Sequence, residues 1–197
     1  MNIPAKINLS ELESTLISNP EWILVKNQIL QKVTRLFAEL AELYLSNPTN
    51  SNLPEEIISI PPKISKGDQY KGLPYLVLDF PRFFDKKHVF AIRTFFWWGN
   101  YFSATIHLKG RYRELYAEKI LNMMSGNQKT EWMINISEEE WIHDLAETEH
   151  WIKFSAFDRD KVKNSDLFKI SASTPILQWD EAGSFLSEIH ALYMGAI

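Results

Sequence analysis

The chain has 197 residues and carries 21 basic against 25 acidic side chains, for a formal net charge of −4. A chain of this length with 45% hydrophobic residues buries roughly 70% of its unfolded surface, so it folds without a disulfide or metal staple. The absence of cysteine excludes a thiol nucleophile and a thiolate zinc site. The seven glycines are not spaced for a phosphate-binding loop, and the mild acidity argues against a dedicated nucleic-acid-binding protein.

The N-terminus and the most apolar segment bear on where the protein resides. Residues 1–10 contain one lysine and no long apolar run, which is not typical of a signal peptide. The most apolar stretch, 89–102, is interrupted by Arg93 and by Gly99-Asn100, and it is too short to span a bilayer. We therefore expect a cytoplasmic protein whose partners include neither a membrane nor a nucleic acid.

Two helices come first, and we expect them to form a helical hairpin over 9–46. Ser10 and Glu13 fit a capping box, which predicts the start of a short helix. Asn19 and Pro20 are typical of an N-cap followed by a first helical residue. The apolar stripe after them keeps a helical period for more than six turns, so it predicts one long amphipathic helix.

A proline-rich connection over 47–72 follows the helices. Five of the nine prolines fall at 47–74, which is typical of an irregular segment, with a short edge strand near 63–65. The sequence leaves open whether this connection is a linker or a lid. The run 73–80 then has the composition of a strand, which we expect to end at Pro81.

Two aromatic, β-rich runs on either side of Gly99-Asn100 predict a β-hairpin. A two-residue loop would place Trp97 opposite Phe102, whereas a three-residue loop places Arg93 opposite His107. We favour the three-residue loop, because its register gathers the more apolar face. The other face then carries Arg93, Phe95, Trp97, Ser103, Thr105 and His107.

The rest of the chain is predicted to alternate helices and strands. We expect helices at 110–125, at 137–147 behind a second capping box of Ser137 and Glu140, and at 180–194, with strands at 131–136, 151–157 and 167–173 and a charged turn at 158–166. Because hairpin-type connections dominate, the fold class is α+β with a mostly antiparallel sheet. We therefore predict a single domain over 1–197, in which the helical hairpin and the C-terminal helix pack on a sheet of about six strands within 73–197.

One face of the predicted sheet gathers groups that suit ligand binding. The favoured register places Arg93 opposite His107, and Asp79 joins them if its strand is adjacent. A carboxylate and an imidazole suit acid–base chemistry, and a guanidinium suits an anion. The alternative is a structural ion pair, under a helix, that orients a histidine on the sheet face. With Trp97 and Thr105 on the same face, these five residues are the predicted binding site for a small anionic ligand.

A second polar cluster has the spacing of a metal site. Glu140, His143, Glu147 and His150 share one side of the predicted helix and form two Glu-x-x-His pairs. Such sites take ligands from several facing helices, and here both pairs fall on one. We therefore interpret the cluster as a solvated helix face, and we predict no metal and no cofactor.

The hairpin aromatics lead to the functional prediction. The run 95–98 points two aromatic side chains to each sheet face, so helices cover both faces or one face meets a ligand or partner. Nucleophile, nucleotide and thiol motifs are absent. We therefore expect a non-catalytic binding or assembly module, homo-oligomeric, that uses the aromatic hairpin or the long helix. The alternative is a small acid–base enzyme with a pocket for an anionic small molecule on the Arg93/His107 sheet face.

Overall fold

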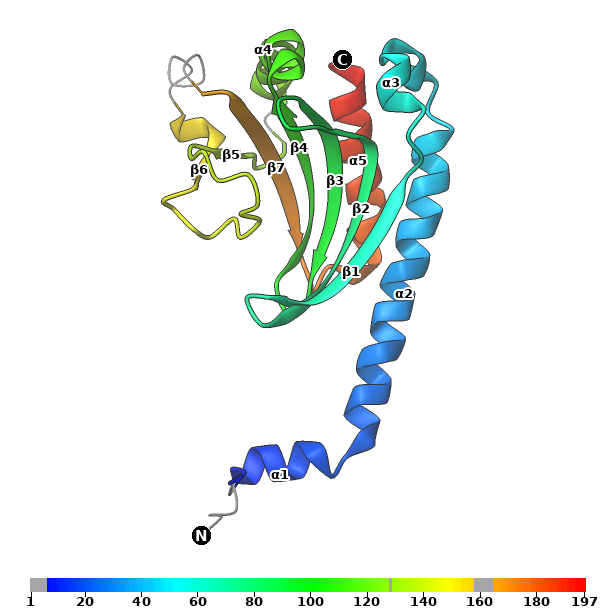
Figure 1. Ribbon diagram of the computed structural model, residues 1–197, viewed down its shortest axis with the longest axis vertical. Coiled ribbons are helices and arrows are strands. Elements are labelled where there is room, and N and C mark those ends of the chain that lie inside the picture. Colours follow the sequence, from blue (N-terminus) through cyan, green and yellow to red (C-terminus); the bar gives the residue numbers. More distant parts are fainter. Residues whose placement is uncertain (1–6, 128, 158–164) are drawn as a thin grey trace.

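The computed structural model describes residues 7–127, 129–157 and 165–197 (Figure 1). In this part of the chain, seven strands form one antiparallel sheet in the order β1-β2-β3-β4-β7-β5-β6. The predicted α+β class is confirmed, with N-terminal and C-terminal helices on one face of the sheet and one strand more than expected. The start of the N-terminal segment and most of the charged turn expected at 158–166 lie outside the described residues.

The helices are α1 (Glu11–Ile17), α2 (Pro20–Leu45), α3 (Glu55–Ile58), α4 (Arg111–Gly126) and α5 (Ala182–Gly195), with short 3-10 helices η1 (Pro48–Asn52), η2 (Phe154–Ala156) and η4 (Trp179–Glu181). The strands are β1 (Lys63–Tyr70), β2 (Leu73–Phe84), β3 (Val89–Trp97), β4 (Tyr101–Lys109), β5 (Met133–Asn135), β6 (Trp151–Lys153) and β7 (Leu167–Pro175). The proline-rich connection thus contains two short helices, and its expected edge strand is longer than three residues.

The N-terminal helices begin where their caps predict. Ser10 and Glu13 make both hydrogen bonds of the capping box at α1, and the Asn19 side chain accepts from the Glu21 backbone at the start of α2. Figure 1 shows α1 turned away from α2 rather than folded back along it, so the expected hairpin arrangement is not formed. Since α1 buries none of its residues, nothing in the body of the protein holds it in a hairpin.

The long helix α2 is buried only along its second half. Its buried residues begin at Val33 and end at Tyr44, and they pack against β2 and α5. At 1.5 Å per residue the helix is about 39 Å long, so its first turns extend past the sheet (Figure 1). The core lies between one face of the sheet and a layer formed by α4, α5 and the C-terminal half of α2.

Strand β2 does not end at Pro81 but continues to Phe84. The pairing with β3 shifts by one residue between Asp79 and Arg82, so Pro81 lies where the ladder does not need its missing N–H. A one-residue shift reverses which face the following side chains point to. Arg82 and Phe84 therefore share a face with Asp79.

The β3–β4 hairpin has a three-residue loop, but its register differs from both expected registers. Trp97 pairs with Tyr101 and Arg93 pairs with Thr105, so His107 lies opposite Ala91 instead of Arg93. The loop covers 98–100 instead of the favoured 99–101, so each β3 residue pairs two positions earlier on β4 than expected. Because side chains alternate with a period of two, a two-residue slip leaves every side chain on its predicted face.

Residues 137–147 form no helix, contrary to the capping-box prediction. The Ser137 hydroxyl accepts from the Glu139 N–H, but the Glu140 carboxylate binds Lys109 instead of returning to the cap. Distant side chains take the backbone groups that a helix would have paired. The chain instead runs in turns over the uncovered face of the sheet, between the short strands β5 and β6.

Candidate functional site

We call residues 136–150 the strap. Two tyrosines of the sheet bind its backbone. The hydroxyl of Tyr70 accepts from the N–H groups of His143 and Asp144, at 2.8 and 2.9 Å. The hydroxyl of Tyr101 donates to the His143 carbonyl at 2.6 Å and accepts from the Leu145 N–H at 2.9 Å. These bonds satisfy the backbone of an irregular segment, so the strap is attached to the sheet.

Lys169 is the third anchor of the strap. Its ammonium donates to the carbonyls of Glu140 and Ile142, at 2.8 and 2.9 Å, and lies 5.0 Å from the centre of the Trp151 ring. The residue is 1% exposed, and burial lowers the pKa of Lys169 to about 7. The two carbonyls accept from this buried nitrogen and the indole face packs beside it, which gives this lysine a structural role.

The strands β2 and β3 are neighbours and Asp79 lies opposite Arg93, so the condition on which Asp79 was expected to join Arg93 is met. The guanidinium binds the carboxylate through two bonds of 2.8 and 2.9 Å, from Nε and Nη2. Its Nη1 lies 3.1 Å from Nε2 of His143 in the strap. Burial holds the pKa of His143 well below its usual value, so the ring is neutral. Because a guanidinium can only donate, Nε2 of His143 is the acceptor.

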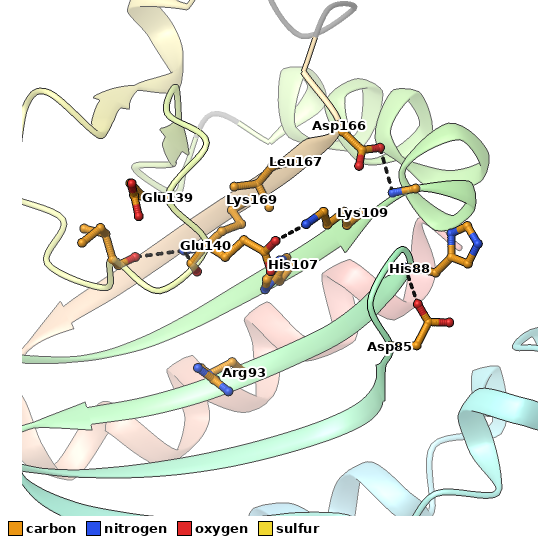
Figure 2. A network of polar contacts seen from close by, with 12 residues as sticks. Asp85, His88, Arg93, His107, Lys109, Glu139, Glu140, Asp166, Leu167 and Lys169 are labelled. Carbon is orange, nitrogen blue, oxygen red and sulfur yellow. Dashed lines mark hydrogen bonds and ion pairs between the residues drawn. The ribbon is translucent and has the colours of Figure 1, made fainter.

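His107 lies further along the same face, as Figure 2 shows, between Arg93 and the Lys109–Glu140 pair. Burial, with the cations Lys169 and Arg93 nearby, holds the pKa of His107 well below its usual value. The neutral ring has a Glu140 oxygen 3.8 Å from Nε2, and within the described residues this nitrogen has no hydrogen-bond partner. His107 is therefore a buried neutral residue. Within the described residues, no hydrogen bond joins it to the Asp79 carboxylate.

The other two predicted ligand-binding residues are part of the covered face. The Thr105 hydroxyl lies 2.8 Å from the Ser171 hydroxyl, and both residues are buried. Trp97 is buried between Tyr70 and Tyr101, with ring centres 5.2 and 5.7 Å away. The strap thus encloses the part of the face that carries Trp97, Thr105 and His107.

A cleft of about 450 Å³ opens beside the strap, over strands β1 to β3. It is lined by Lys63, Ser65, Tyr70, Tyr75, Val77, Asp79, Arg82, Phe84, Arg93, Phe95, Trp141 and His143. Of the predicted ligand-binding residues, Asp79 and Arg93 line it and the other three do not. The role of all five in ligand binding stays a prediction.

Sequence reasoning missed Arg82 and Lys63 as lining residues. The signal for Arg82 was Pro81, because a proline inside a strand run indicates a bulge, and a bulge re-aims the residues after it. The signal for Lys63 was weaker. Its edge strand lies within the proline-rich connection, where only 63–65 had the composition of a strand.

Glu140, His143, Glu147 and His150 do not form the solvated helix face expected for them, because 137–147 is not helical, and they bind separate partners. His143 binds Arg93, Glu140 binds Lys109, and Glu147 pairs with Lys71 at 2.7 Å and with His150 at 3.6 Å. Over 7–127, 129–157 and 165–197, no three acidic or histidine side chains converge as metal ligands. The same ranges contain no helix that combines the length and apolar character of a membrane span.

The aromatic hairpin lies in the interior of the protein. Phe95, Phe96, Trp97 and Phe102 are all buried, because helices cover one face of the hairpin and the strap covers the other. Helix packing explains the burial of Phe96 and Phe102, whose ring centres lie 5.1 Å apart. The hairpin therefore leaves little free aromatic surface for a partner.

Exposed apolar residues gather instead at the N-terminal end, in residues 7–25, which we call the arm. The arm comprises α1 and the first turns of α2, which extend away from the sheet (Figure 1). Its exposed large side chains are Ile7, Leu9, Leu12, Leu16, Ile17, Trp22, Ile23, Leu24 and Val25. Exposed apolar residues concentrated in one segment in this way mark an interaction surface.

No family model, no curated protein and no solved structure matches this chain significantly. The functional argument therefore rests on the two features described above, the arm and the cleft.

Proposed function

We propose that the protein is a non-catalytic assembly module that forms a homodimer, in which the arm of one chain packs against the arm of a second copy. The observation that supports this most strongly is the apolar surface of the arm. Its nine large side chains are between 38% and 86% exposed. A standard stable interface buries roughly 800 Å² on each partner, and nine exposed large apolar side chains provide surface of that order.

The start of α2 is apolar on all sides. Trp22, Ile23, Leu24 and Val25 are consecutive and each is more than 40% exposed. Successive residues of a helix are about 100° apart, so these four surround its axis. A helix that is apolar all round is buried in a core or a membrane, and a flat docking surface covers only one of its sides. An interlocked partner arm covers more than one.

The charge of the arm favours a protein partner over an anionic membrane surface. Residues 7–25 contain three glutamates and no lysine or arginine. Helices that bind in the membrane interface carry basic residues on their polar face, which these lack. The apolar side chains of the arm thus suit a protein surface of similar apolar character.

The bend between α1 and α2 gives the arm a shape that complements itself. An apolar groove of about 420 Å³ lies in the bend, lined by Leu9, Leu16, Ile17, Trp22 and Ile23 among others. Leu24 and Val25 follow directly on α2. In a two-fold dimer the same patch is used on both chains, so each groove receives apolar side chains from the partner's arm.

The test is sedimentation equilibrium of the wild-type chain and of Leu24→Glu. We expect the wild type at twice the 23.0 kDa chain mass and the variant at the chain mass, because a carboxylate in an apolar interface is not compensated. Leu115→Glu is the matched control, since Leu115 lies on helix α4 and is 56% exposed, against 59% for Leu24. A wild-type monomer at micromolar concentration contradicts the proposal, and so does a Leu24→Glu dimer.

A further inference from the structure

We propose that the cleft over β1 to β3 binds a small aromatic anion, with its ring among the cleft aromatics and its anionic group on Arg82 and Lys63. This site is separate from the arm and does not depend on dimerisation. The volume of about 450 Å³ lies within the range of small-molecule sites, which is roughly 300–1,000 Å³. The strap forms one wall through Trp141 and His143, and the sheet forms the floor.

The charge balance of the lining favours an anion. Three cations, Lys63, Arg82 and Arg93, face one carboxylate, Asp79. Arg93 is already paired with Asp79 through two bonds, so the two other cations are the excess. A cleft lined by an excess of one charge attracts a ligand of opposite charge.

Arg82 and Lys63 are available to a ligand. Arg82 donates Nε to the Pro61 carbonyl at 2.9 Å, which fixes the side chain, and no described ion pair involves its guanidinium. Lys63 lies on the edge strand β1, and within the described residues it has no acidic partner in an ion pair. A guanidinium held at one nitrogen presents its remaining N–H groups in the planar geometry that suits a carboxylate or phosphate.

The ring of the ligand would meet an aromatic lining. Tyr75 and Phe95 lie with ring centres 5.9 Å apart on the floor of the cleft. Trp141 in the strap is 54% exposed, and its ring centre lies 6.2 Å from that of Phe84. A tryptophan exposed to this extent beside a cleft provides a face on which a planar group stacks at low entropic cost.

The experiment measures binding of naphthalene-2-carboxylate by isothermal titration calorimetry. Naphthalene-2-carboxamide has nearly the same shape without the charge, and acetate has the charge without the ring. We expect saturable binding of the carboxylate, with each of the two analogues at least tenfold weaker, because charged hydrogen bonds and ring stacking both contribute. Equal binding of the carboxamide, or no saturable binding at millimolar carboxylate, overturns the proposal.

Variants locate the binding. Arg82→Gln and Lys63→Gln are each expected to weaken naphthalene-2-carboxylate binding about tenfold. Lys66→Gln is the matched control, because Lys66 lies on the same strand but lines a different cavity, on the other face of the sheet. Lys63 is exposed, so its substitution does not endanger folding. Unchanged affinity in both cleft variants overturns the proposal, as does an equal loss in Lys66→Gln.

The dimer proposal and the ligand-binding proposal can be tested independently. The monomeric Leu24→Glu chain retains every residue of the cleft, so we expect it to bind naphthalene-2-carboxylate with wild-type affinity. Loss of binding in that variant would contradict the separation of the two sites.

Discussion

The two faces of the sheet are covered in different ways. On the helix face, α2, α4 and α5 pack on rows of apolar side chains such as Phe80, Ile92 and Phe102. On the strap face, an irregular segment is attached through polar groups, among them Arg93 and Lys169. The helix face is stabilised by contact area, whereas the strap face is stabilised by hydrogen bonds between specific groups. Substitutions should therefore behave differently on the two faces.

The largest effect is expected on the helix face. Phe102→Ala removes a fully buried ring whose neighbours Phe96 and Trp179 lie 5.1 and 5.4 Å away, centre to centre. We expect a loss of about 3–5 kcal/mol in the free energy of unfolding, from lost transfer energy and a cavity. Urea unfolding measures it. Leu177→Ala, at a 93% exposed position, should stay within about 0.5 kcal/mol of wild type. A loss for Phe102→Ala no larger than that for Leu177→Ala would show that the helix face repacks around the missing ring.

The Asp79–Arg93 pair tests the strap face. Asp79→Leu leaves the partly buried guanidinium beside neutral His143 without its carboxylate, and we expect a loss of about 2 kcal/mol in unfolding free energy. Adding Arg93→Met should restore part of that loss, because an apolar pair of similar volume needs no charge compensation. Urea unfolding of both single variants and the double variant gives the coupling energy. Additive losses would mean that the two charges act independently, against the geometry of two direct bonds.

The two faces of the β3–β4 hairpin could be told apart from the sequence because their signal is local. Alternation with a period of two assigned Arg93, Thr105 and His107 to one face, and that assignment survives the register error. The error itself was a slip of two residues, which the alternation cannot detect. The caps at Ser10 and Asn19 are likewise local, and both helices begin there.

The strap could not be predicted, because its hydrogen bonds join residues far apart in the chain. The Ser137–Glu140 pattern is a local helix signal, and it is overridden by groups that the strand order brings close. Tyr70 binds the N–H of a residue 73 positions away, and Lys169 binds a carbonyl 27 positions away. No periodicity within 136–150 carries that information. The cleft was only half predicted for the same reason, since Arg82 reaches it through the shift at Pro81.

Histidine adds a pH dependence on the helix face. His190 is buried against Tyr44, and burial lowers its pKa from 6.5 to about 4. Below pH 6.5 the unfolded chain takes up a proton that the folded chain does not. Stability therefore falls as the pH falls, by about 1.4 kcal/mol per pH unit for this group, until the pH reaches about 4.

The measurement compares unfolding free energies of wild type and His190→Gln between pH 7 and pH 4.5. The variant should be less stable at pH 7, because it loses the stacked ring, but its stability should fall less steeply. Carboxylates titrate equally in both chains, so the difference in slope reports His190. Parallel curves would show that this histidine is protonated in the folded protein.

The smallest expected losses of stability come from removing one tyrosine hydroxyl. They distinguish the two faces most clearly, because a Tyr→Phe substitution is available on each face. Tyr101→Phe removes the hydroxyl that binds the strap backbone, and Tyr193→Phe removes one that donates to the carbonyls of Ala104 and Ile170 under the helices. Each should cost about 1–2 kcal/mol in total stability. Amide hydrogen exchange separates them, because it reports stability residue by residue.

Without the Tyr101 hydroxyl, the N–H of Leu145 loses its partner, so exchange should accelerate within the strap while β4 and β7 keep wild-type rates. Without the Tyr193 hydroxyl, exchange should accelerate in the sheet amides that open only on global unfolding, since both of its acceptors lie in strands β4 and β7. If Tyr101→Phe accelerates sheet and strap equally, the strap unfolds together with the core, and the polar attachment is as cooperative as the apolar one. A selective effect means that the wall of the cleft opens at a lower free energy than its floor, which allows a ligand to enter without unfolding the sheet.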